Sequence, residues 1–309
     1  MTAAPVAAPV APWGLFLTAA RRVQRLSPSF VRVTLAGHDL HHVADQGWDT
    51  RCKLLLPVPG AGLDVLPGGP DWYAGWRALP DEARLPMRTY TVRAVRPELG
   101  EVDVDLVLHE PNGPAGRWAA AAVPGSPVGF VAPDARHPGP YGGYEFHLPA
   151  DDPDVLLAAD ETAVPAVAAI LERLPRTAHG TALLEVPYAA DVLAIDAPPG
   201  VRLRWLGREG AAHGSLLLPA VREALALRSA GCGPEAVPVP DPDAGPDAGA
   251  EALVWDAPQD VDRGSGPYAW VAGEAGMVRD LRRCLLAEHA LDRRRVALMG
   301  YWRRGRASG

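Results

Sequence analysis

The pattern of apolar residues changes partway along this 309-residue chain, and the change limits the folds open to it. Up to residue 131, short segments with apolar alternation are separated by Pro, Gly and Ser, which is typical of strands joined by turns. After the Pro- and Gly-rich stretch 133–144, short apolar runs alternate with amphipathic segments of helical period. Alternation of strand and helix indicates a parallel sheet covered by helices. The sequence therefore predicts an all-β domain followed by an α/β domain.

The first part predicts a six-stranded antiparallel barrel over residues 15–145, preceded by a disordered tail over 1–14. A short amphipathic helix is expected at 71–79, as a loop excursion. The clearest strand alternates Val102, Val104, Leu106 and Leu108 with more polar residues, so one face is buried. Small antiparallel barrels are built from short strands of this kind. The expected strands cover residues 16–26, 30–35, 51–58, 87–96, 101–109 and 127–131.

The second part predicts a parallel-sheet α/β domain over residues 150–309. A stretch rich in Pro, Gly, Ala and Asp, residues 229–266, is expected to be a flexible insertion in which 252–255 pairs locally. The expected strands are 155–159, 181–186, 201–206, 268–272 and 295–299, and the expected helices are 161–174, 215–227 and 274–290.

Composition excludes several classes of protein. A net charge of −7 argues against a general nucleic-acid binder. No apolar run approaches the roughly 20 residues that span a bilayer, and the start of the chain lacks the early positive charge of a signal peptide. The three cysteines are far apart, without a C-x-x-C pair, so a disulfide framework or metal cluster is not expected. The histidines at 38, 41 and 42 indicate a solvated loop rather than a metal site. We expect a cytoplasmic monomer.

The most specific motif is the hexapeptide Arg88-Thr89-Tyr90-Thr91-Val92-Arg93. On a strand, Arg88 and Tyr90 share one face and the two threonines share the other. An arginine beside a tyrosine offers a cation for a pyrophosphate and a flat ring for a ring system. An ordinary half-exposed strand uses the same residue types.

A second motif, Gly-Pro-Ala-Gly-Arg-Trp-Ala at residues 113–119, predicts the start of a helix with Pro114 in its first turn. Free amides and the positive end of the helix dipole favour a pyrophosphate there. A helix that only caps the barrel is the plainer interpretation.

Three further motifs lie in the second part of the chain. Asp-Glu-Thr-Ala-Val-Pro at 160–165 follows an expected strand, where open α/β sheets bind ligands. Asp160 as a simple helix N-cap is the alternative, and both can hold. Tyr-Ala-Trp-Val-Ala-Gly-Glu-Ala at 268–275 marks another strand-to-helix turn. The chain then ends in Leu-Met-Gly-Tyr-Trp-Arg-Arg-Gly at 298–305, where an exposed basic tail is the alternative to a site.

These motifs, in this order, resemble the siderophore-interacting proteins, which are FAD-dependent ferric-siderophore reductases with a ferredoxin-reductase-like fold. The resemblance runs from about residue 18 to residue 306 outside the insertion, with Ala159 where the family often has glycine. It implies FAD on the barrel, in contact with Arg88, Thr89, Tyr90, Thr91, Val92, Arg93, Val107, His109, Ala115, Gly116 and Trp118. It implies NAD(P)H on the α/β domain, in contact with Asp160, Glu161, Thr162, Ala163, Gly273, Glu274 and Ala275.

For the substrate, a ferric siderophore, the resemblance implies Lys53, the only lysine in the chain, with Tyr301, Trp302, Arg303 and Arg304. Hydride would pass from NAD(P)H to flavin N5, and single electrons from the flavin to Fe(III). No protein side chain is assigned a catalytic role and no metal site is expected.

Several alternatives stay open at this point. One is a non-enzymatic siderophore- or flavin-binding protein, and another is a general NAD(P)H:flavin reductase. Reduced ferredoxin is a further donor to consider. The choice between NADH and NADPH is open, with Arg202, Arg204 and Arg208 as candidates for a 2′-phosphate. The class of siderophore is also open.

Overall fold

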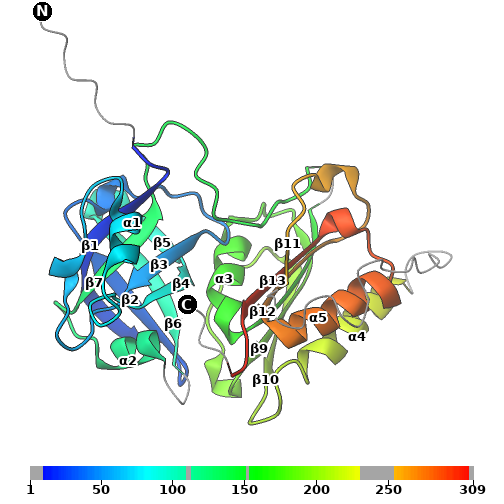
Figure 1. Cartoon of the computed structure of the whole chain (residues 1–309). Coiled ribbons are helices and arrows are strands. Elements are labelled where there is room, and N and C mark those ends of the chain that lie inside the picture. Colours follow the sequence, from blue (N-terminus) through cyan, green and yellow to red (C-terminus); the bar gives the residue numbers. More distant parts are fainter. Residues whose placement is uncertain (1–9, 109–112, 151–152, 230–253, 306–309) are drawn as a thin grey trace, which may run out of the picture.

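The computed structural model of the chain describes residues 10–108, 113–150, 153–229 and 254–305. It contains two sheets, each with its own hydrophobic core (Figure 1). Among the helices in these ranges, none combines the length and the apolar character needed to cross a membrane.

The first sheet is antiparallel and curled, with strand order β4-β3-β7-β1-β2-β6-β5. Its interior is filled by alternate residues of the strands, among them Phe16, Val33, Leu54, Val104 and Phe130. Two helices accompany it, α1 (Trp72–Ala78) and α2 (Pro114–Ala121). The strands are β1 (Trp13–Arg25), β2 (Phe30–Ala36), β3 (Arg51–Leu55), β4 (Met87–Thr91), β5 (Ala94–Arg96), β6 (Glu101–Val107) and β7 (Pro127–Pro133).

The sheet has seven strands where the sequence predicts six, because the expected strand 87–96 is divided. Its first half, β4, pairs with β3, and its second half, β5, pairs with β6. At the break, Val92 N donates to Thr50 O at 2.8 Å, and Arg93 N donates to Asp103 O at 2.9 Å. The segment thus joins the two edges of the curled sheet. Trp13 and Gly14, which the sequence assigns to the tail, belong to β1.

The second sheet has strand order β10-β9-β8-β12-β13-β11 and is mixed. Five strands are parallel and β11 is antiparallel to β13, so the expectation of a purely parallel sheet is wrong at that edge. The strands are β8 (Asp154–Asp160), β9 (His179–Val186), β10 (Gly200–Gly207), β11 (Trp255–Asp256), β12 (Tyr268–Glu274) and β13 (Val296–Trp302). The helices are α3 (Val164–Arg173), α4 (Leu217–Ser229) and α5 (Ala275–Arg283).

Two expectations for this region need correction. The helix expected at 274–290 is α-helical only as far as Arg283. The next five residues, Cys284–Glu288, continue it as one wider π-helical turn. The end of the expected flexible insertion belongs to the fold, because β11 pairs with β13 and Val261 is buried. Residues 230–253 lie outside the described ranges. Short 3-10 turns occur at Leu40–His42, Leu63–Val65, Pro97–Leu99, Glu161–Ala163, Ala189–Asp191, Val261–Arg263 and Arg293–Arg295.

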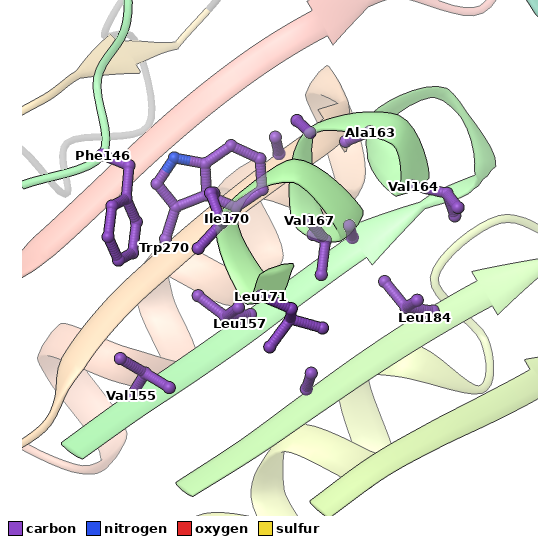
Figure 2. Packing of buried hydrophobic residues seen from close by; sticks show 14 of the residues in the cluster. Phe146, Val155, Leu157, Ala163, Val164, Val167, Ile170, Leu171, Leu184 and Trp270 are labelled. Carbon is purple, nitrogen blue, oxygen red and sulfur yellow. The ribbon is translucent and has the colours of Figure 1, made fainter. Parts of the chain in front are cut away.

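Helix α3 lies between the second sheet and the barrel, whereas α4 and α5 cover the opposite face (Figure 1). Every residue from 164 to 171 is buried, which is the pattern of a helix covered on all sides. Its apolar side chains pack on β8 and β9, with Phe146 and Trp270 alongside (Figure 2). Phe30, from the barrel, joins the same cluster. The two domains therefore share part of one core.

Polar contacts also join the two domains. Asp191 is fully buried and accepts hydrogen bonds from Ser27 Oγ at 2.7 Å, Ser29 N at 2.7 Å and Ser29 Oγ at 2.8 Å. Arg173, at the end of α3, forms an ion pair with Asp45 of the barrel at 2.5 Å. A buried carboxylate satisfied by three donors from the other domain favours one relative placement of the two sheets.

Candidate functional site

Pairing between β3 and β4 determines which face of the sheet each residue of the β4 motif occupies. Tyr90 lies opposite Cys52, and Thr89 lies opposite Lys53. Directly opposite residues share a face. Because Cys52 is fully buried, Tyr90 takes the inner face, and its ring packs against the barrel core. On the outer face, Lys53 Nζ donates to Thr89 Oγ1 at 2.7 Å.

Two cations, Arg88 within this motif and Lys53 on the paired strand, have no carboxylate partner within the described ranges. Arg88 Nη1 donates to the carbonyl of its neighbour Met87 at 2.8 Å. Burial, with the nearby charge of Arg51, lowers the pKa of Lys53. A half-buried cation without a counter-ion is stabilised by an anion that binds beside it.

Arg93 is placed differently from Arg88. Its guanidinium donates to Glu172 of α3 through two hydrogen bonds of 2.7 and 2.5 Å, and its Nε lies 3.7 Å from Asp105 Oδ2. This cation is engaged at the domain interface. Its predicted contact with FAD stays a prediction, as does that of Val92, which is buried.

Helix α2 begins at Pro114, and no side chain among the described residues caps its first turn. Ala115 and Gly116 are buried. Trp118 packs against the barrel core and donates from Nε1 to the carbonyl of residue 127 at 3.1 Å. The uncapped amides in the first turn of α2 make the start of this helix suitable for a phosphate group. Val107 ends β6 and packs on the core of the second domain, and His109 lies outside the described residues.

Asp160, at the carboxyl end of β8, is fully buried and satisfied by four hydrogen bonds. Its Oδ1 accepts from Thr162 N at 2.9 Å and from Thr162 Oγ1 at 2.5 Å. Its Oδ2 accepts from Glu274 N at 2.7 Å and from Trp302 Nε1 at 2.9 Å. Burial and the neighbouring Glu161 carboxylate raise the pKa of Asp160 to about 7. Asp160 thus connects the ends of three strands.

The turn after β12 depends on a glycine. Gly273 has a φ of 148°, and a Cβ there would lie 2.6 Å from Asp160 Cγ. Glu274 follows it and caps α5, with Oε2 accepting from Gly276 N at 2.7 Å and Met277 N at 3.0 Å. Two amides at the start of this helix are therefore already bound by a carboxylate.

Buried charges beside Asp160 are paired as well. Arg208 donates to Glu161 through two hydrogen bonds of 2.7 and 2.8 Å, and its Nη1 lies 3.4 Å from Glu185 Oε1. Glu185 also accepts from three amides at the start of α4, those of residues 214, 216 and 217, at 2.7 to 3.0 Å. Ala163 and Ala275, the other residues expected near the nucleotide, are buried.

The arginines considered for a 2′-phosphate are not gathered at this edge. Arg208 is committed to Glu161. Arg202 and Arg204 line a separate cavity of about 260 Å³ at the amino ends of the strands, and Arg204 pairs with Glu223 at 2.8 Å. The three arginines therefore do not form one phosphate site.

A cavity of about 310 Å³ opens at the carboxyl edge, between the starts of α4 and α5. Its charged lining consists of Glu274, Asp280 and Arg304, and burial lowers the pKa of His213 beside them. The full lining is Ala212, His213, Gly214, Leu218, Glu274, Gly276, Met277, Asp280 and Arg304.

The C-terminal residues expected at the substrate are divided between two faces. Tyr301 and Trp302 are consecutive on β13 and point to opposite faces of the sheet. Tyr301 stacks on Trp255 with ring centroids 6.1 Å apart, and Trp302 contacts His213 at 5.0 Å. Only Tyr301 therefore approaches the barrel side. Arg303 is half-buried, and Arg304, whose amide donates to Glu274 Oε1 at 3.3 Å, lines the cavity on the Trp302 side.

Sequence reasoning missed a contact between the domains next to Lys53. The Arg51 guanidinium lies 4.9 Å above the Trp255 ring. Glu145 Oε1 accepts from Trp255 Nε1 at 3.2 Å and pairs with Arg51 Nη2 at 3.1 Å. The available signals were a tryptophan in a segment otherwise poor in aromatic residues, and an arginine two positions before Lys53, on the same face of β3.

Comparison with known proteins identifies the family. Residues 19–137 match the siderophore-interacting FAD-binding domain, and residues 152–305 match the siderophore-interacting protein model. Over 285 residues the chain is 30% identical to the ferric vibriobactin reductase ViuB of Vibrio cholerae, covering 92% of this chain and 88% of the relative. The chain belongs to the siderophore-interacting protein family.

Solved structures of this family agree. A siderophore utilization protein from T. fusca superposes with a TM-score of 0.69 and 31% identity, covering 96% of both chains. The siderophore-interacting protein SipS from Aeromonas hydrophila gives 0.64 and 27%, covering 95% of this chain and 93% of that one. The family predicted from the motifs is thus confirmed, and the matches support a siderophore-related flavoprotein reductase.

Proposed function

We propose that this siderophore-interacting protein uses FAD to reduce a ferric siderophore, with NAD(P)H as the electron donor. One observation carries the proposal. On neighbouring strands of the barrel, Arg88 and Lys53 are cations without a carboxylate partner in the described parts of the chain. They supply positive charge for two anionic ligands, a nucleotide diphosphate and a metal chelate.

The residues of the barrel fit FAD. Within the described residues, the guanidinium of Arg88 donates only to the carbonyl of Met87, so it is available to a diphosphate. The uncapped first turn of α2 offers amides for the same group. Tyr90 and the threonines of the motif fix the position of β4, and a flat ring system would lie against this strand. FAD, when bound, supplies the redox chemistry, taking a hydride from a nicotinamide nucleotide and passing single electrons to ferric iron.

The protein contributes position and charge. In the proposed site, Arg88 and α2 bind the diphosphate, while Lys53 attracts the anionic chelate on the other face of β3 and β4. One hydride carries two electrons, so one nicotinamide nucleotide would suffice for two ferric ions. Fe(II) is held less tightly than Fe(III) by hard oxygen ligands, so the iron can then leave the chelator.

The carboxyl edge of the second sheet is where the nucleotide is proposed to bind, beside Asp160 at the end of β8, Glu161 and Thr162 in the turn that follows, and Gly273 and Glu274 at the end of β12. One observation there favours a second candidate function. Glu274 already occupies the first amides of α5, which a nucleotide phosphate would otherwise use. A flavoprotein that binds ferric siderophores and takes electrons from another donor, such as reduced ferredoxin, is that second candidate.

An anaerobic absorbance assay tests the proposal. The protein is loaded with FAD and mixed with NADH or NADPH, then with a ferric chelate and a ferrous-specific trap. Bleaching of the flavin followed by trapped Fe(II) supports the proposed reductase. Bound flavin that neither nucleotide bleaches, but that reduces the chelate after dithionite treatment, favours the second candidate. Protein that takes up no FAD contradicts both.

A further inference from the structure

Trp255 presents an aromatic surface where the two domains meet. Its side chain is 42% exposed, which is unusual for a tryptophan held on a strand. The backbone of β11 pairs Trp255 with Met299 of β13, and its ring stacks on Tyr301 with an interplanar angle of 21°. The indole is therefore exposed and yet fixed in position.

The charges around this indole are arranged asymmetrically. Arg51 lies over the ring, but Glu145 neutralises it through an ion pair of 3.1 Å and also accepts from the indole Nε1. Lys53, two residues along β3 on the same face, has no carboxylate partner in the described ranges. The surface next to the indole thus combines the exposed part of an apolar ring with the charge of Lys53, which has no counter-ion among the described residues.

We infer that Trp255 is a specificity residue that binds the aryl rings of catecholate chelates of ferric iron. This inference rests on the proposed reduction of ferric siderophores. A tricatecholate complex of Fe(III) is trianionic and presents flat rings, so it matches both the indole and Lys53. A trihydroxamate complex is neutral and need carry no ring, so it matches neither feature.

The position of Trp255 separates it from the other proposed ligands. It lies across from Arg51 on β3, on the Lys53 face, whereas Arg88 lies on the other face of the neighbouring strand. Trp302, on the opposite face of β13, donates to Asp160 at the carboxyl edge of the second sheet, where the nucleotide is proposed to bind. The indole of Trp255 is thus placed for the substrate rather than for the diphosphate or the nicotinamide nucleotide.

The test measures binding without electron transfer. Gallium(III) has the charge of Fe(III) and is not readily reduced, so gallium tricatecholate and gallium trihydroxamate are titrated into FAD-loaded protein. We expect Trp255→Leu to weaken tricatecholate binding roughly fivefold to tenfold, the range of an aromatic stacking contact. Trp255→Phe should recover most of the loss, and trihydroxamate binding should not change. Tyr73→Leu, which removes an exposed aromatic residue on α1, is the matched control.

Three results would overturn the inference. Trp255→Leu could leave tricatecholate binding unchanged, or weaken both chelates equally, or change the dissociation constant of FAD instead. If Trp255→Leu does not fold, Trp255→Met takes its place as a second apolar variant without a ring. The proposed function is judged separately, with the iron chelates. If dithionite-reduced wild type reduces neither of them, that function fails whatever the gallium titrations give.

Discussion

The β3–β4 side of the barrel and the carboxyl edge of the second sheet differ in how fully their charged side chains are satisfied by partners among the described residues. On the barrel, Arg88 and Lys53 have only neutral oxygen partners in the described parts of the chain. At the carboxyl edge, the buried Asp160, Glu161 and Glu185 are each satisfied by donors from the protein itself.

This difference separates two kinds of site. Cations left without counter-ions gain most when an anionic ligand arrives, so the barrel has charge available for binding. A network that satisfies its own members instead fixes the shape of the edge and offers a ligand little new charge. We therefore expect changes at the edge to affect stability, and changes on the barrel to affect ligands.

The largest effect is expected from Arg208→Leu. The side chains of Arg208 and Glu161 are 7% and 4% exposed, so the variant leaves a buried carboxylate without its partner. Breaking such a pair costs about 3–5 kcal/mol of the free energy of unfolding. Chemical denaturation measures this loss. Arg204→Leu removes the more exposed pair with Glu223 and should cost much less stability, because solvent screens an exposed ion pair. Equal losses in the two variants would contradict the assignment of a buried network.

The next effect concerns FAD. We expect Arg88→Ala to weaken FAD binding on the order of a hundredfold, because hydrogen bonds to a charged group contribute about 1.5–3 kcal/mol. Titration of the apoprotein, followed by flavin fluorescence, measures the dissociation constant. Arg88→Lys should recover part of the affinity, since lysine keeps the positive charge but lacks the paired N–H donors of a guanidinium. Arg21→Ala, which changes an exposed arginine of β1, is the control. Unchanged FAD affinity in Arg88→Ala would remove this residue from the site.

A third prediction concerns pH and Asp160. The pKa of this carboxyl is about 7 in the folded protein, against 3.8 for an ordinary aspartate. Between these values the native state keeps a proton that the unfolded state has lost. The stability that Asp160 contributes is therefore lost as pH rises from about 4 to about 7, by at most about 1.4 kcal/mol per pH unit.

Unfolding of wild type and Asp160→Asn across this range isolates the contribution of Asp160. The free energy of wild type minus that of the variant should decrease as pH rises. Taking this difference removes the opposite contribution of His213, whose pKa is lowered by burial. A difference that stays constant or increases with pH would show that Asp160 is ionised in the folded protein throughout.

Much of the barrel side was predictable because its pattern is local. Alternation along residues 88–91 places Tyr90 and Thr89 on opposite faces, and the pairing with β3 confirms this. The break at Val92 and Arg93 was not predictable. It depends on the pairing of the following residues with β6, and on an ion pair of Arg93 with Glu172 in the other domain.

The division of the C-terminal residues follows from period-2 alternation, which places Tyr301 and Trp302 on opposite faces from the sequence alone. Trp255 is a different case. It lies within a stretch rich in Pro, Gly, Ala and Asp, in which the sequence predicts only local pairing of residues 252–255. Its position depends on a two-residue strand and on Arg51 and Glu145, which lie far away in the sequence.

The smallest predicted effect concerns Lys53 and tests whether its charge on the barrel is available to an anionic ligand. We expect Lys53→Ala to raise the apparent Michaelis constant for a trianionic ferric chelate by roughly threefold to tenfold, about 1 kcal/mol for one partly exposed charge. FAD binding should not change, because Lys53 lies on the opposite face from Arg88. Lys53→Arg should retain the wild-type constant, and a neutral chelate should be insensitive to either change. If the neutral chelate is affected as strongly as the anionic one, Lys53 acts by shaping the barrel wall and not by its charge.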